Sequence, residues 1–120
     1  MSQGLPAPGT EHHRQANYAE LEGHLLAPGD FRVTPAGRPV LVLELEHLSR
    51  HEEPESLPLL EMRMPVLVIG EQALICRSLA PGTPLRVTGR LNQKRWVRDG
   101  KVRWGCVELV AMEIRVLPAP

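Results

Sequence analysis

Aromatic residues are scarce in this chain of 120 residues, which contains one Phe, one Tyr and two Trp. Its hydrophobic core must therefore consist mainly of Leu, Val, Ile and Met, and the hydrophobic fraction of 42% is sufficient to build one. A chain of this length has room for one domain with one core. Long hydrophobic runs are also missing, so no segment is predicted to span a membrane.

Cysteine is rare as well, and Cys76 and Cys106 fit no metal-ligand spacing. We interpret them as reduced thiols of a cytoplasmic protein. Residues 1–16 lack the basic and apolar regions of a secretory signal. The adjacent His12 and His13 are interpreted as solvated side chains of a flexible segment. We therefore expect no metal, no cofactor and no membrane attachment.

Patterns typical of catalysis are missing too. No Ser/His/Asp or Cys/His set has a usable spacing, and no Gly-rich phosphate loop follows a predicted strand. Glu44 and Glu46 lie on one face of a predicted strand, where paired carboxylates are usually solvated. We expect a binding protein and not an enzyme.

An excess of charge of one sign is absent, since fourteen basic residues balance fourteen acidic ones. This balance argues against a protein that coats nucleic acid indiscriminately. The charges are nevertheless segregated along the chain. Residues 44–61 contain six acids and one base, Arg50. Residues 84–104 contain one acid, Asp99, and the bases Arg86, Arg90, Lys94, Arg95, Arg98, Lys101 and Arg103. The sequence thus predicts a local basic site on a neutral protein.

Twelve Pro and ten Gly interrupt the chain often, which favours short strands over long helices. Alternating or continuous apolar residues predict strands over residues 17–26, 40–47, 60–69, 85–91 and 102–116. Gly23 is a candidate β-bulge, and residues 31–39 form a loop or ribbon. Apolar residues at helical spacing predict one helix over residues 71–79, which Pro81 and Gly82 end.

Three strands, one short helix and two further strands are the order of the oligonucleotide/oligosaccharide-binding (OB) fold. We therefore predict an all-β chain with a five-stranded OB-fold barrel and the helix between strands three and four. Residues 1–16 are expected to form a disordered N-terminal arm, residues 17–117 the OB-fold domain, and residues 118–120 a tail.

The basic cluster falls on the connection between strands four and five, where OB-folds bind ligands. Asp99 and Gly100 predict a hairpin turn there. A protein that binds a single strand needs positive charge along the phosphate backbone of the strand and flat side chains under its bases. The candidate residues are Lys94, Arg95, Arg98, Lys101 and Arg103 for charge, Trp96 for stacking, and Arg32 and Arg38 on the first long loop.

Three other interpretations of this region stay open at this point. The basic hairpin is equally explained as a solvated tip that keeps a β-edge from aggregating. Trp96 could fold back onto the barrel. Trp104 is interpreted as a core or dimer-interface residue, because tryptophan tends to be largely buried.

Several motifs resemble primosomal replication protein N, the PriB family. They are residues 34–47 (TPAGRPVLVLELEH), Glu52 and Glu53, residues 64–70 (MPVLVIG), and the segments 17–23 and 81–89. The resemblance covers residues 17–116. It implies a homodimer of OB-folds that binds single-stranded DNA and works with the PriA helicase and DnaT in replication restart.

The sequence departs from that family at two places. Glu61 stands where the family carries a tryptophan that stacks on DNA bases, and the loop with Trp96 is longer. The first hypothesis is therefore a single-stranded DNA-binding accessory protein of the primosome that bridges DNA and PriA. The alternative is a protein–protein adaptor with weak or lost DNA binding, in which residues 52–55 engage a basic surface. A third hypothesis is recognition of structured RNA.

Overall fold

The computed structural model describes residues 15–50 and 59–119. These residues contain six strands and one short helix. The elements are β1 (Ala19–Leu25), β2 (Asp30–Val33), β3 (Pro39–Ser49), β4 (Leu60–Ile69), α1 (Glu71–Cys76), β5 (Pro84–Arg98) and β6 (Lys101–Val116). Residues 1–14 of the predicted N-terminal arm and the acidic segment 52–55 lie outside the described residues. No helix in the described ranges is long and apolar enough to cross a membrane.

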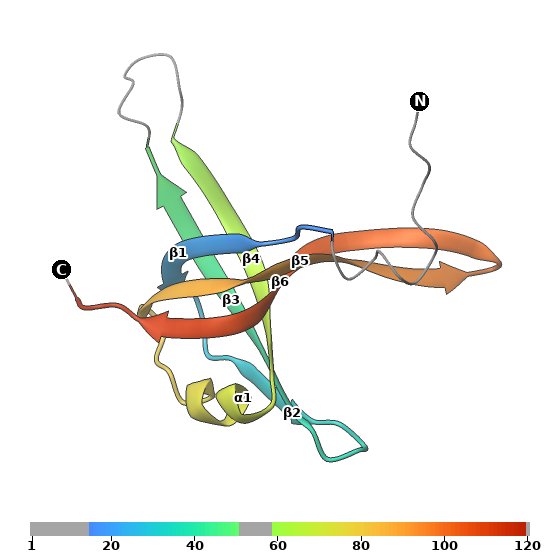
Figure 1. Cartoon of the computed structure of the whole chain (residues 1–120), viewed down its shortest axis with the longest axis horizontal. Coiled ribbons are helices and arrows are strands. Elements are labelled where there is room, and N and C mark those ends of the chain that lie inside the picture. Colours follow the sequence, from blue (N-terminus) through green and yellow to red (C-terminus); the bar gives the residue numbers. More distant parts are fainter. Residues whose placement is uncertain (1–14, 51–58, 120) are drawn as a thin grey trace.

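Five of the strands close into a barrel (Figure 1). β1 pairs with β5 along most of its length and with β3 at His24 and Leu25. β3 pairs with β4, β4 runs parallel to β6 at Val66 and Leu67, and β6 returns to β5. This ring, with α1 between β4 and β5, confirms the predicted OB-fold. The short β2 lies outside the ring and pairs only with β3, so the segment predicted as a loop or ribbon is a ribbon.

Alternate side chains of the strands fill the barrel. On β3, Leu41, Leu43 and Leu45 are buried while Val42 and Glu44 between them face outward, as the sequence predicts. On β4 the continuous apolar run 66–69 favours burial on both faces, but the structure buries only one. Val66 and Val68 are buried, but Ile69 is 41% exposed because its strand has an outer face there.

Helix α1 contributes Ala73 and Cys76 to the core. It ends at Cys76, earlier than predicted, although Leu79 still packs against the core cluster. Its outer side carries Leu74 and Ile75, which are exposed. The helix therefore covers the barrel interior with one face only, as a plug must.

Two glycines mark places where strands cross too closely for a side chain. A Cβ on Gly23 would collide with the backbone oxygen of Glu46, where β1 changes partner from β5 to β3. A Cβ on Gly89 would collide with the backbone oxygen of Val110. A register shift lies at Gly89 and none is found at Gly23. The predicted bulge at Gly23 is therefore wrong, and that glycine serves close strand approach instead.

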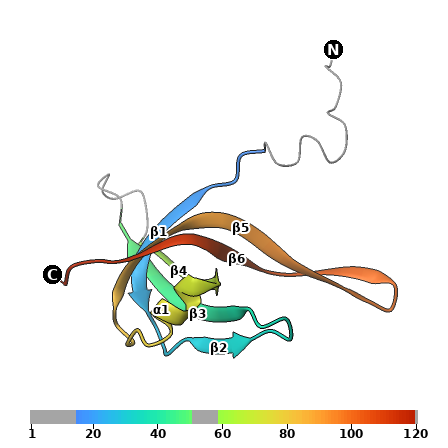
Figure 2. The same cartoon turned by 60° about the horizontal axis from the view of Figure 1, so that its bottom comes forward.

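β5 and β6 continue beyond the barrel as a two-stranded ribbon, which we call the arm (residues 92–98 and 101–107). Figures 1 and 2 show the arm projecting from the barrel on the same side as the turn between β2 and β3. The sequence predicted a strand that ends at Leu91 and a polar hairpin after it. The strand instead runs to Arg98, so the predicted loop is regular β-structure.

Candidate nucleic-acid interface

The arm ends in a two-residue turn at Asp99 and Gly100, as predicted. Asp99 has φ 53° and Gly100 has φ 73°, and positive φ at both central residues is characteristic of a type I′ turn. Such a turn matches the twist of the flanking strands and fixes their register. Arg98 therefore pairs with Lys101, Val97 with Val102, Trp96 with Arg103 and Arg95 with Trp104.

This register divides the arm into two chemically different faces. Directly opposed residues of an antiparallel pair project to the same side, and neighbours along a strand project to opposite sides. The first face, which we call the basic face, consists of Lys94, Trp96, Arg98, Lys101 and Arg103. The second, the apolar face, consists of Arg95, Val97, Val102 and Trp104. Five of the eight predicted binding residues therefore lie on one side of one ribbon.

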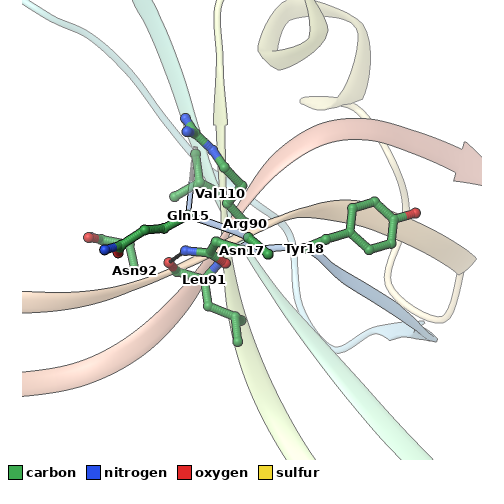
Figure 3. Close-up of a pocket in the computed structure, with 8 residues that line it drawn as sticks. Gln15, Asn17, Tyr18, Arg90, Leu91, Asn92 and Val110 are labelled. Atoms are coloured by element: carbon green, nitrogen blue, oxygen red, sulfur yellow. Dashed lines mark hydrogen bonds between the residues drawn. The ribbon is translucent and has the colours of Figure 1, made fainter. Parts of the chain in front are cut away.

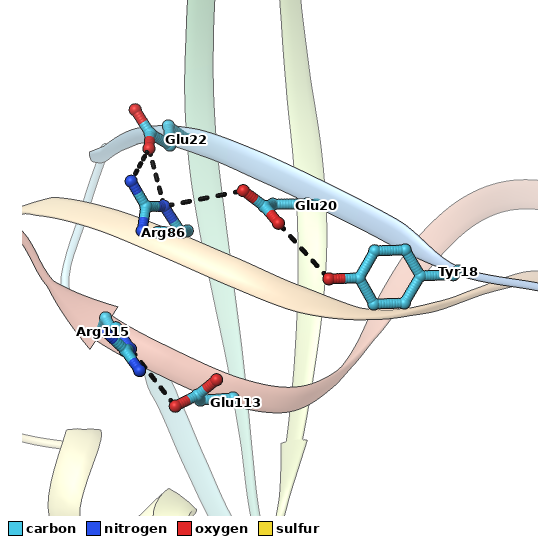
Figure 4. A network of polar contacts seen from close by, with 6 residues as sticks. All are labelled: Tyr18, Glu20, Glu22, Arg86, Glu113 and Arg115. Atoms are coloured by element: carbon cyan, nitrogen blue, oxygen red, sulfur yellow. Dashed lines mark hydrogen bonds and ion pairs between the residues drawn. The ribbon is translucent and has the colours of Figure 1, made fainter.

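The cations of the basic face differ from those on the barrel in having no acidic partner within the described residues. On the barrel, Arg86 contacts Glu22 at 2.6 Å and Glu20 at 3.7 Å, and Arg115 contacts Glu113 at 3.3 Å (Figure 4). The hydrogen bond from Arg86 to Glu22 raises the pKa of the guanidinium further. The positive charges of Arg86 and Arg115 are thus neutralised on the barrel, whereas those of the basic face are left available on the arm, where a polyanion can bind.

Trp96 is held flat against the ribbon by the absence of a side chain at Gly105. A Cβ at that position would lie 2.7 Å from Cζ3 of Trp96 and 3.2 Å from its Cη2. The indole is 46% exposed, so it neither folds into the barrel nor projects freely. Since Lys94 and Arg103 lie beside it on the same face, the ring is a platform flanked by cations, as base stacking requires.

The position of Gly105 depends on an irregularity in the arm. The register shifts between Gln93 and Arg95, because β6 carries one residue more than β5 over this interval. Such a bulge bends and twists its strand locally. It also places Gly105 against the indole of Trp96, which occupies the space that a side chain at this position would need.

Trp104 was expected in the core or at a dimer interface, and it is not a core residue, since it is 62% exposed in the single chain. The guanidinium of Arg95 lies over its ring at 5.9 Å from the centroid, a cation–π contact. Val97 and Val102 next to it are also exposed. The apolar face therefore offers a second indole. A shallow groove of about 640 Å³ at this part of the arm is lined by residues of both faces, namely Asn92, Gln93, Lys94, Arg95, Trp96 and Trp104.

The two candidates on the first long loop lie apart from the arm. Arg32 is on β2 and pairs with Asp30 at 3.1 Å, so part of its charge is neutralised. Arg38 follows the turn between β2 and β3, where its backbone N–H donates to Thr34 Oγ1. The arm gathers Lys94, Arg95, Trp96, Arg98, Lys101 and Arg103, whereas Arg32 lies on β2 and Arg38 just before β3.

Sequence reasoning counted Arg90 in the basic stretch and considered Trp104 for the core or a dimer interface, but it placed neither among the candidate binding residues. The Asp99–Gly100 turn was a sufficient signal for Trp104, because a two-residue hairpin fixes which residues pair on either side of it.

No cluster of three or more His, Cys, Asp or Glu residues that could hold a metal is found within residues 15–50 and 59–119.

The fold agrees with comparisons with known proteins. Residues 17–102 match a family described as "Another single-strand binding protein family". This match covers more than half of the chain, so the chain belongs to that single-strand binding protein family, whose fold is the OB barrel described above. No curated protein sequence matches the chain.

Three solved structures illustrate the similarity. The single-stranded DNA-binding protein of Plasmodium falciparum, in complex with single-stranded DNA, has a TM-score of 0.71 at 17% identity, over 87% of this chain and 96% of that one. PriB from Ralstonia solanacearum has a TM-score of 0.65 at 24% identity, over 85% and 98%. The small single-stranded DNA-binding protein of Streptomyces coelicolor has a TM-score of 0.64 at 25% identity, over 82% and 92%.

Proposed function

We propose that this protein binds single-stranded DNA through the basic face of its arm. The observation that carries the proposal is the combination of four cations without an acidic partner in the described residues and one exposed indole on a single side of a ribbon. The cations attract the phosphates, and Trp96 stacks under a base, which is worth about 1–3 kcal/mol per base. Membership of a single-strand binding protein family supports the same function.

Arg38 extends this surface in the proposal. The β2–β3 turn that carries it projects from the same side of the barrel as the arm (Figures 1 and 2). A DNA strand that leaves the basic face can therefore reach Arg38 and, beside it, Arg32. Arg32 contributes less because Asp30 already pairs with it.

The cellular role proposed here is replication restart. The motifs shared with the PriB family, and the similar fold of Ralstonia PriB, support an accessory protein of the primosome. In this role the protein works as a homodimer in the cytoplasm and bridges single-stranded DNA and the PriA helicase, with DnaT.

A protein–protein adaptor is the second candidate, and Glu61 favours it. This residue is exposed on β4, at the position where the resemblance calls for a base-stacking tryptophan. A carboxylate there repels phosphate, so the surface of β3 and β4 is poorly suited to DNA. In this case DNA binding would be weak and a helicase contact would be the main function.

Fluorescence anisotropy of a labelled oligodeoxythymidine of about 15–30 nucleotides at low and moderate salt separates the two. Binding that is measurable at low salt and weakens as the salt concentration rises supports the DNA-binding function. No binding even at low salt refutes it and favours the adaptor. A pull-down with PriA then tests the adaptor directly. Neutralising Glu52, Glu53 and Glu55 should abolish the pull-down if that segment makes the contact.

A further inference from the structure

An open pocket of about 1020 Å³ lies where the arm leaves the barrel (Figure 3). It is formed by the segment that leads into β1 and by neighbouring residues of β5 and β6. The lining residues are Gln15, Ala16, Asn17, Tyr18, Arg90, Leu91, Asn92 and Val110. Gln15, Asn17, Arg90 and Asn92 supply amide and guanidinium groups to this lining, whereas the Tyr18 ring points away from the other lining residues and its hydroxyl contacts Glu20 (Figure 3).

The floor of the pocket is fixed by Asn17. Its Nδ2 donates to the backbone oxygen of Leu91 at 2.8 Å, and its Oδ1 accepts from the backbone N–H of Leu91, also at 2.8 Å. Regular pairing between β1 and β5 ends at Ala19 and Gly89, so the Asn17 amide extends the ladder beyond its last strand pair. The backbone N–H of Leu91 is satisfied in this way and is not available to a ligand.

Asn92 is held in one orientation by a buried carboxylate. Its Nδ2 donates to Glu108 Oε2 at 2.9 Å, and Glu108 is only 8% exposed. Because the amide nitrogen faces this carboxylate, the Oδ1 of Asn92 remains as a hydrogen-bond acceptor.

Arg90 is exposed and makes no ion pair within the described part of the chain. In Figure 3 its side chain leaves β5 on the side opposite to that of Leu91. β5 alternates without interruption from here to the tip, so Arg90 and Asn92 project to the same side as Lys94, Trp96 and Arg98. The pocket is therefore the inner end of the basic face.

We propose that this pocket is a nucleobase subsite that gives the basic face a preference for guanine. The inference rests on the proposed function. Guanine presents two adjacent acceptors, O6 and N7, which match the fork of an arginine guanidinium, and Arg90 supplies that fork. Its N1–H and amino group are donors for an acceptor such as Asn92 Oδ1. Thymine has a single acceptor, O4, on the corresponding edge and adenine presents one acceptor beside a donor, so neither matches Arg90 in the same way.

The test compares a 15-nucleotide oligodeoxythymidine with the same strand carrying one central guanine, by competition anisotropy at moderate salt. We expect the guanine strand to bind about fivefold or more tightly, the lower end of what a bidentate arginine–guanine pair gives. Replacing that guanine by 7-deazaguanine, which lacks the N7 acceptor, should remove most of the difference.

Arg90→Lys keeps the charge and loses the fork, so the affinity ratio of the two strands should fall to about one. Arg115→Lys, on the barrel and paired with Glu113, is the matched control and should retain the wild-type ratio. Equal binding of both strands by the wild-type protein, or an unchanged ratio in Arg90→Lys, would overturn the subsite and leave the proposed function intact. Failure of both strands to bind would instead overturn the proposed function.

Discussion

Removing two cations from the basic face should change the salt dependence of DNA binding by a predictable amount. Each contact between a cation and a phosphate of single-stranded DNA contributes about −0.7 to the slope of log affinity against log salt. Lys94, Arg98, Lys101 and Arg103 lie on one face and have no acidic partner in the described ranges, so each is available for one phosphate. The expected slope is about −2.8, and a tenfold rise in salt should weaken binding about 600-fold.

The double variant Lys94→Ala, Arg98→Ala keeps two of these contacts. Its slope should be about −1.4, and the same tenfold rise in salt should weaken binding only about 25-fold. Both side chains are exposed, so their removal should leave the free energy of unfolding nearly unchanged. Anisotropy titrations of a labelled oligodeoxythymidine at four or more salt concentrations give both slopes.

Arg115→Ala is the control for this experiment because its charge is already paired with Glu113 on the barrel. Its slope should equal that of the wild-type protein. An unchanged slope in the double variant, with reduced slope in the control, would refute the assignment of the binding surface to the arm.

Three further predictions concern single features of the structure. Gly105→Ala should displace Trp96, because the ring atom Cζ3 would lie 2.7 Å from the new Cβ. Single-strand binding, measured by anisotropy, should weaken by the loss of about 1–3 kcal/mol of stacking. Cys106→Ala is the neighbouring control. Gly23→Ala should lower the free energy of unfolding in urea by about 1–3 kcal/mol or prevent folding, because its Cβ would collide with backbone of Glu46; wild-type stability would show that β1 does not approach β3 as described. Thiol labelling at about pH 8 should show one fast phase from the exposed Cys106 and one slow phase from the buried Cys76, and Cys106→Ser should remove the fast phase alone. Burial raises the pKa of the Cys76 thiol, so its neutral form stabilises the fold below the ordinary cysteine pKa, and this contribution is lost as pH rises through the raised value.

The barrel could be predicted because its sequence signals are local. Alternation of leucine and glutamate on β3 shows which side faces the core, and Pro81 and Gly82 separate the helix from β5. Strand β2 forms because it pairs with β3 across the β2–β3 turn. The four residues of β2 show no clear alternation of apolar and polar side chains. It was therefore predicted only as a loop or ribbon.

The arm could be predicted only in part. Residues 92–98 are polar apart from Trp96 and Val97. A ribbon with solvent on both sides has no buried face to impose a period of two. The Asp99–Gly100 turn nevertheless fixes the pairs near the tip. What the sequence does not show is the bulge opposite Lys94, and thus the contact of Trp96 with Gly105. It also does not show that the barrel ends before Trp104, which leaves that indole exposed.

The position of the bound strand is tested most directly by tryptophan fluorescence, because Trp96 and Trp104 are the two tryptophans of the chain and lie on opposite faces of the arm. Trp104→Phe leaves Trp96 as the single emitter, and Trp96→Phe leaves Trp104. Stacking on a base should quench Trp96 along a curve that matches anisotropy, while Trp96→Phe should bind more weakly. Quenching of Trp104 alone, with Trp96 unaffected by a saturating strand, would contradict the assignment of single-strand binding to the basic face.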